Sequence, residues 1–144
     1  MSRRTASHEA TRRGVLAAAV GGLAAIAGCN TLSNGDRDDD AVRVPALEVE
    51  NQDDDAHDIE LALSREDGSQ AFASTASVAA GDATVFDAPV DGSAAYTLVV
   101  SLDDDRVERE LAAYVEGDQR CVRPVVRVTA DSALKLTAQT YDDC

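Results

Sequence analysis

Hydrophobic and polar residues alternate with a period of two along most of the chain after residue 42. In the stretch 57–65, Ile59 and Leu61 share one parity, while Asp58 and Glu60 fall on the other. Successive side chains of a strand point to opposite faces, so this pattern predicts a strand with one buried face. Similar segments, separated by Gly, Asp and Ser, predict seven or eight strands: residues 42–49, 57–65, 70–78, 83–87, 94–102, 106–115, 122–129 and 133–141.

Local features add detail to this strand pattern. Pro45 interrupts the first segment and marks an edge or a bulge, because proline has no amide hydrogen for a ladder bond. Residues 94–102 are apolar on both faces, which predicts a central strand. Residues 66–69, with Gly68, and the pair Asp131-Ser132 are predicted hairpin turns. The chain is therefore predicted to be all-β, with one sandwich or barrel.

The first 29 residues follow a different pattern. Residues 15–27 form an apolar run that is too short to cross a ~30 Å hydrocarbon layer as a helix at ~1.5 Å per residue. Arginines precede this run, Arg12 and Arg13 among them, and the small residues Ala27 and Gly28 precede Cys29, an order typical of a signal peptide. The alternative is a buried helix with an incidental cysteine, but residues 15–27 have no polar face.

Residues 11–29 resemble the signals of twin-arginine-exported lipoproteins, with TRRGVL as the export motif and IAGC as the lipobox. This resemblance implies that residues 1–28 are cleaved and that Cys29 accepts lipid. Residues 29–41 would then form an acidic tether and residues 42–144 the domain. Two acyl chains hold a protein firmly on a membrane, so we expect the protein on the outer face of the cytoplasmic membrane.

The chain is strongly acidic, with 13 basic and 27 acidic residues. Removing residues 1–28 takes away four of the basic and one of the acidic residues, which leaves a net charge near −17. We expect no nucleic-acid partner, because phosphates would be repelled. The acidity, with Lys135 as the single lysine, resembles that of proteins from extremely halophilic archaea. An ordinary acidic secreted protein is the alternative.

Residues 90–100, VDGSAAYTLVV, resemble the turn and tyrosine that lead into a late strand of immunoglobulin-like and fibronectin-like domains. The resemblance extends over about residues 42–144 and to small exported haloarchaeal lipoproteins. It implies a single immunoglobulin-like antiparallel β-sandwich. The buried tryptophan and paired cysteines of antibody domains are missing, because the sequence has no Trp and its cysteines lie elsewhere. A fold by itself assigns no function.

Two cysteines remain after Cys29, at positions 121 and 144. A hairpin centred between Asp131 and Ser132 places Cys121 opposite about residue 142, close to Cys144. In an oxidising exterior this predicts a Cys121–Cys144 disulfide. Two free thiols or a metal pair are the alternatives, although no third soft ligand accompanies the cysteines.

Candidate sites are few. Asp53, Asp55 and His57 form the one cluster that resembles a metal site, but their spacing fits neither a zinc site nor a calcium loop, so we expect a solvated acidic loop with at most weak cation binding. Neither GxSxG nor HExxH is present, so we expect no enzyme and no cofactor. A hydrolase with unusual carboxylates is a third, weaker possibility.

These observations favour a lipid-anchored interaction or surface-structural module outside the cytoplasm. The alternative is an accessory protein that presents an ion or small solute to a transporter or redox system. We expect the membrane, through the lipid on Cys29, and an unidentified protein as partners. The domain itself is expected to be a monomer or a weak oligomer.

Overall fold

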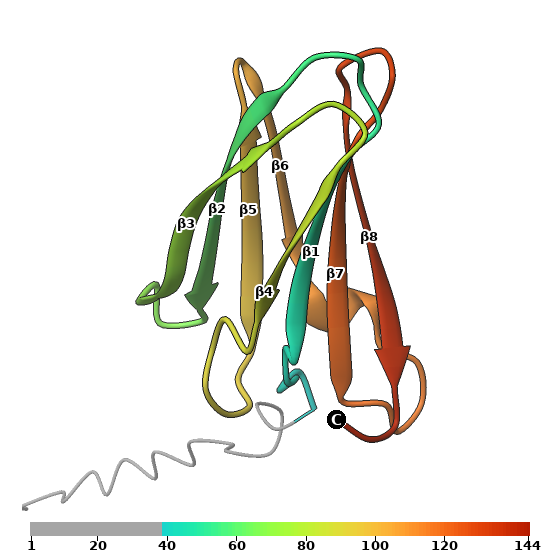
Figure 1. Ribbon diagram of the computed structural model, residues 1–144. Helices are drawn as coiled ribbons and strands as arrows, with labels where there is room; N and C mark the ends of the chain where they lie inside the picture. The colour runs from blue at the N-terminus through green and yellow to red at the C-terminus, as the bar shows by residue number, and fades with distance from the viewer. Residues whose placement is uncertain (1–38) are drawn as a thin grey trace, which may run out of the picture. The chain divides into compact units, whose positions relative to one another are not determined.

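A computed structural model of the protein describes residues 39–144 (Figure 1). The predicted signal peptide, with Arg12 and Arg13, and the predicted lipid acceptor Cys29 lie outside the described residues. The elements are β1 (Ala46–Asn51), β2 (His57–Arg65), β3 (Gln70–Val78), β4 (Ala83–Asp87), β5 (Tyr96–Leu102), β6 (Asp105–Glu110), the 3₁₀ helix η1 (Leu111–Tyr114), β7 (Cys121–Val128) and β8 (Leu134–Tyr141). Within residues 39–144, no helix is long and apolar enough to cross a membrane.

The strands form two four-stranded sheets, in the orders β4-β1-β7-β8 and β3-β2-β5-β6. The sheets face each other as two layers (Figure 1), and the side chains between them come from alternate positions of the strands. The largest fully buried ones are Tyr96 and several aliphatic residues, among them Leu47, Ile59, Leu63 and Leu98. The predicted all-β sandwich is therefore confirmed, and β5 lies inside its sheet as its two apolar faces predicted.

One pairing departs from the predicted antiparallel arrangement. β1 lies parallel to β7, with Glu48 opposite Val125 and Asn51 opposite Val128. The physical reason is the connection between the sheets: the chain leaves β6 through η1 and starts β7 at the end of the sandwich where β1 also starts (Figure 1). The two strands therefore run in the same direction.

The first strand begins later than predicted, at Ala46 rather than residue 42. Val42 and Arg43 make only isolated bridges, to Ala94 and Cys121. The register with β7 then slips by one residue before Glu48 pairs with Val125. Pro45 lies at this interruption, as the sequence predicted for an edge or a bulge.

Pro124 lies inside β7, where a proline is unusual. The Val122 amide donates to the Arg43 carbonyl at 2.8 Å. Backbone groups two residues apart point to the same side of a strand, so the nitrogen of Pro124 also faces the segment that leads into β1. That segment is interrupted at Pro45, because the ladder with β7 resumes only at Glu48. The missing amide hydrogen of Pro124 therefore removes no ladder bond.

The predicted strand 106–115 is wrong in its second half. β6 ends at Glu110, and Leu111–Tyr114 form the 3₁₀ helix. The chain changes sheets here, and the tight turn buries Leu111 completely. The Tyr114 hydroxyl then donates to the Leu136 carbonyl at 3.2 Å, so η1 covers part of the free edge of β8. Burial raises the pKa of Tyr114.

The turn before β5 agrees with the sequence pattern. Gly92 has a φ of 77°, a conformation that favours glycine. The Tyr96 hydroxyl donates back to the carbonyls of Asp91 at 3.2 Å and Gly92 at 3.4 Å. This is the tyrosine-corner contact of sandwich domains. The contact holds the connection between β4 and β5 against Tyr96, whose side chain is buried.

Candidate functional site

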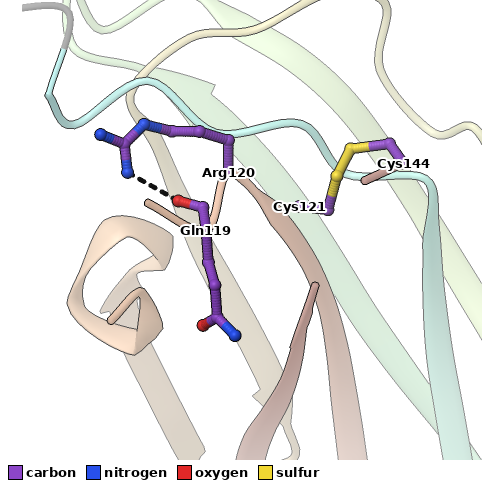
Figure 2. The surroundings of a disulfide bond; sticks show 4 residues. All are labelled: Gln119, Arg120, Cys121 and Cys144. Atoms are coloured by element: carbon purple, nitrogen blue, oxygen red, sulfur yellow. Dashed lines mark hydrogen bonds between the residues drawn. A yellow bond between two sulfur atoms is a disulfide. The ribbon is translucent and has the colours of Figure 1, made fainter. Parts of the chain in front are cut away.

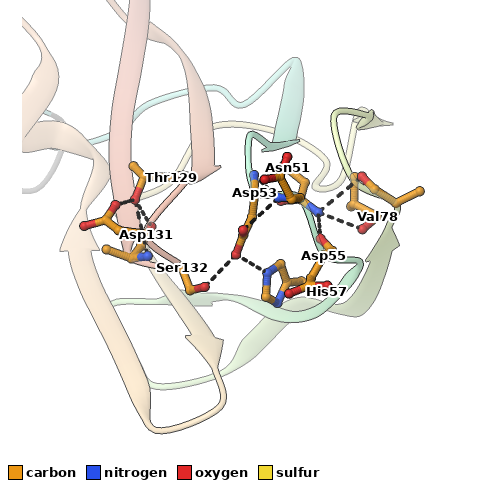
Figure 3. A network of polar contacts seen from close by, with 11 residues as sticks. Asn51, Asp53, Asp55, His57, Val78, Thr129, Asp131 and Ser132 are labelled. Carbon is orange, nitrogen blue, oxygen red and sulfur yellow. Dashed lines mark hydrogen bonds and ion pairs between the residues drawn. The ribbon is translucent and has the colours of Figure 1, made fainter.

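Four connections gather at one end of the sandwich, here called the loop end: β1–β2, β3–β4, β5–β6 and β7–β8 (Figure 1). β1 starts at the opposite end, where the C-terminus also lies (Figure 1). The loop end holds the candidate cluster of Asp53, Asp55 and His57. Figure 3 shows that this cluster belongs to a polar network that reaches the β7–β8 hairpin.

Asp53 is the centre of this network. Its side chain is 9% exposed, and its Oδ2 accepts a hydrogen bond from Ser132 Oγ at 2.5 Å and another from His57 Nε2 at 2.8 Å. Its Oδ1 accepts from the Asp54 amide at 2.7 Å. These donors favour the charged carboxylate, so the bonds from Ser132 and then His57 lower the pKa of Asp53 to about 2. The carboxylate is therefore ionised and fully engaged at neutral pH.

Asn51 supports Asp53 from the end of β1. It is 2% exposed, and its Nδ2 donates to the carbonyls of Asp55 at 2.7 Å, Val78 at 3.1 Å and Ala79 at 3.2 Å. Its Oδ1 accepts from the Asp53 amide at 3.0 Å. One amide side chain thus joins the β1–β2 loop to the end of β3.

The β7–β8 hairpin presents Ser132 to Asp53. Ser132 has a φ of 59°, and its amide donates to the Thr129 carbonyl at 2.9 Å. The Thr129 hydroxyl contacts the Asp131 carboxylate and lies 3.2 Å from the Ala133 carbonyl. The Thr129 hydroxyl bond lowers the pKa of Asp131. The turn is thereby fixed with the Ser132 hydroxyl directed toward the network (Figure 3).

The order of these contacts decides what the network can do chemically. In a Ser-His-Asp triad the histidine lies between serine and aspartate and takes the serine proton. Here Asp53 lies between the other two, because Ser132 and His57 share its Oδ2. His57 Nε2 is directed to Asp53, so this arrangement does not activate Ser132 as a nucleophile.

The structure brings only two of the three candidate metal residues together. Of the three candidate residues, Asp53 and His57 come together but bond to each other, whereas Asp55 contributes its backbone carbonyl to Asn51. Within residues 39–144, no group of three or more His, Cys, Asp or Glu side chains is placed to hold a metal ion. This network of Asn51, Asp53, His57 and Ser132, here called the clamp, joins three of the four loops to one another.

Sequence reasoning missed two members of the clamp, Asn51 and Ser132. Asn51 carried a signal, since it continues the buried parity of Leu47 and Val49 and an amide at a core position needs internal hydrogen bonds. Ser132 carried none, because it lies 79 positions from Asp53 in the chain.

The predicted disulfide is present at the opposite end of the sandwich. Cys121 and Cys144 are bonded, with their Cα atoms 5.5 Å apart (Figure 2). Cys121 pairs with Tyr141, one residue earlier than the hairpin prediction placed it. Beside it, Arg120 Nη1 donates to the Gln119 carbonyl at 2.6 Å. The disulfide therefore fastens the C-terminus to the start of β7.

Comparison with known proteins supplies the family. Residues 55–142, more than half of the chain, match the family described as "Halobacterial Ig-like domain". Among curated proteins, none matches this chain. The match covers all strands from β2 to β8 and the tyrosine corner, while β1 lies before it. The chain belongs to the halobacterial Ig-like domain family, in agreement with the immunoglobulin-like pattern around Tyr96 and with the halophile-like composition.

Proposed function

We propose that this protein is a lipid-anchored surface module, with its Ig-like sandwich held outside the cytoplasmic membrane for interaction with other macromolecules. An Ig-like domain suggests a surface or interaction role, and the family is consistent with an extracellular location. The family match carries the interaction part of this proposal, and the clamp supports a scaffold role for the loop end. Asp53, His57 and Ser132 have side chains of the types used in acid–base and nucleophilic chemistry. Here the His57 and Ser132 side chains both bond to the Asp53 carboxylate. In this arrangement they support the loop scaffold.

The direction in which the chain enters the sandwich supports the anchored arrangement. The domain begins at the end opposite the loop end (Figure 1). In the proposed arrangement, the tether from Cys29 joins the domain at the end that holds the disulfide. The exposed residues of the loop end include Asp54, Asp55 and Asp104. An acidic, well-hydrated tip of this kind suits a surface that works in concentrated salt.

Membrane fractionation of the full chain in its host tests the anchor. We expect Cys29→Ala to appear in the medium and Cys144→Ser to stay with the membrane, because only the first substitution removes the lipid acceptor. Mass spectrometry of the membrane-bound protein should show a modified Cys29 at the new N-terminus. Retention of Cys29→Ala on washed membranes would contradict the proposal.

The export route needs its own experiment. We expect Arg12→Lys with Arg13→Lys to leave the precursor uncleaved inside the cell, because the paired arginines are the export signal in this class. The matched control is Arg3→Lys with Arg4→Lys, which changes the same charge type outside the motif. Normal processing of the Arg12 and Arg13 double variant would remove the export assignment.

A further inference from the structure

One side of the sandwich is nearly free of charge. This side, here called the β3–β4 side, is formed by the edge strands of the two sheets, QAFASTASV and ATVFD. Asp87 is the single charged residue among these fourteen, whereas the 28% charged residues of the chain would predict about four. The edge strand β6, DRVERE, has only one uncharged residue. Charged edge strands keep protein copies apart, so the β3–β4 side lacks a protection that β6 has.

Among residues 39–144, the outward-facing backbone groups of β4 have no hydrogen-bond partner. The Asn51 amide donates to the Asp82 carbonyl at 2.9 Å, and the Ala88 amide donates to the Pro45 carbonyl at 2.8 Å. By strand alternation, residues 84 and 86 also bond to β1. The amides and carbonyls of Ala83, Val85 and Asp87 therefore point away from the sheet. At the middle of this edge, Val85 is 44% exposed.

The acidic side chains of β1, the strand next to β4, are paired with arginines. The two outward-facing acids, Glu48 and Glu50, are paired with Arg123 and Arg127 at 2.7 Å each. In the other layer, β3 carries no charged side chain. A second strongly acidic molecule that approaches β3 and β4 meets one charged side chain on these two strands, Asp87. The nearest other unpaired acids lie beside the two strands, at Asp58 and Glu60 of β2 and at Asp82 before β4.

We infer that β4 pairs with β4 of a second copy of this chain, antiparallel about a two-fold axis at Val85. The two four-stranded sheets then join into one. This inference goes beyond the proposed function, since it needs neither the lipid anchor nor the export signal. The pairing is self-complementary: Val85 lies opposite Val85 of the partner copy, and Ala83 lies opposite its Asp87. A two-fold contact of this kind closes on itself and gives a dimer rather than a fibre.

The position of Asp87 is compatible with this pairing. The two Asp87 side chains lie four residues apart along the joined strands, about 14 Å at ~3.4 Å per residue. Charges are screened over only ~3 Å at ~1 M ionic strength, so the two carboxylates barely interact in concentrated salt. The other edge of the same sheet is less accessible, because Tyr114 already donates to the Leu136 carbonyl of β8.

Cysteine cross-linking of the full chain in molar salt tests the geometry. Directly opposed residues of a hydrogen-bonded antiparallel pair have Cα atoms about 5.5 Å apart, within the range of a disulfide. We expect mild oxidation to link Val85→Cys to itself, with the 85–85 peptide identified by mass spectrometry. The control is Glu108→Cys, exposed on the edge strand β6. Equal rates of cross-linking for the two variants would overturn the inference.

Sedimentation of the same chain tests the energetics. We expect a concentration-dependent dimer that Val85→Lys weakens roughly tenfold or more, because two ammonium groups would then face each other across the axis. Val85→Thr keeps the strand-favouring shape and should dimerise much more like the wild type. Thermal unfolding checks that Val85→Lys is folded, as its exposure predicts. A wild-type chain that is monomeric at all concentrations, or Val85→Lys that dimerises like the wild type, would refute the pairing.

Discussion

Replacing Asn51 with alanine should destabilise the domain more than its single side chain suggests. Four hydrogen bonds depend on this buried amide, and the carbonyls of Asp55, Val78 and Ala79 lose their side-chain partner. Each bond contributes a net ~0.5–1.5 kcal/mol, and a buried polar group left unpaired costs ~1–3 kcal/mol. Because Nδ2 has only two hydrogens for three carbonyls, we expect a total loss of about 3 kcal/mol rather than the full sum.

The assay is thermal and urea-induced unfolding in molar salt, followed by circular dichroism. A loss of about 3 kcal/mol corresponds to a fall in Tm of roughly 10–20 °C for a domain of this size. Asn51→Asp is nearly isosteric and should lose at least as much at neutral pH, because a carboxylate would face the same carbonyl oxygens. Gln52→Ala is the control, since Gln52 is exposed and should change stability by less than ~0.5 kcal/mol. If Asn51→Ala loses under ~1 kcal/mol, the amide does not hold the loops.

Three further predictions concern single groups. The folded-state pKa of Asp53 lies at about 2, below the model-compound value of 3.8, so the stability it brings is present above ~pH 4 and is lost as the pH falls toward ~2; Asp53→Asn should reduce that pH dependence in melting curves. Cys144→Ser opens a bridge between residues 23 positions apart and should cost about 3.4 kcal/mol in the chain-entropy model, measured by urea unfolding; an unchanged midpoint would contradict this. Tyr96→Phe removes the hydroxyl bonded to Asp91 and Gly92 and should cost about 1 kcal/mol, with an unshifted Tm as the opposing result.

Much of this fold could be predicted from local alternation. The limits of β2, β3 and β4 agree with the sequence pattern to the residue, because each is a short strand between residues that favour turns. The pattern failed where tertiary packing decides the local structure. Leu111 and Ala113 continue the strand parity, yet the change of sheet bends this segment into a 3₁₀ turn that buries Leu111.

The candidate site was predictable only in part. The nearness of Asp53 and His57 follows from their spacing in one loop. Their partner Ser132 comes from a hairpin at the other end of the sequence, and no local pattern records that contact. The parallel pairing of β1 with β7 was hidden for the same reason, because alternation shows which face of a strand is buried but not which strand lies beside it.

That parallel pairing has a consequence for how the chain folds. Residues 57–110 contain every strand of the β3-β2-β5-β6 sheet, so this layer can form from one continuous stretch. β1 can pair with β4 early, but its pairing with β7 must wait for a strand whose Arg127 lies 77 positions after its partner Glu50. Contacts of such high sequence separation slow folding, since the intervening chain must first be ordered. The second layer is completed only when β8 has been synthesised as far as Tyr141, so the domain closes late, when almost the whole chain is available.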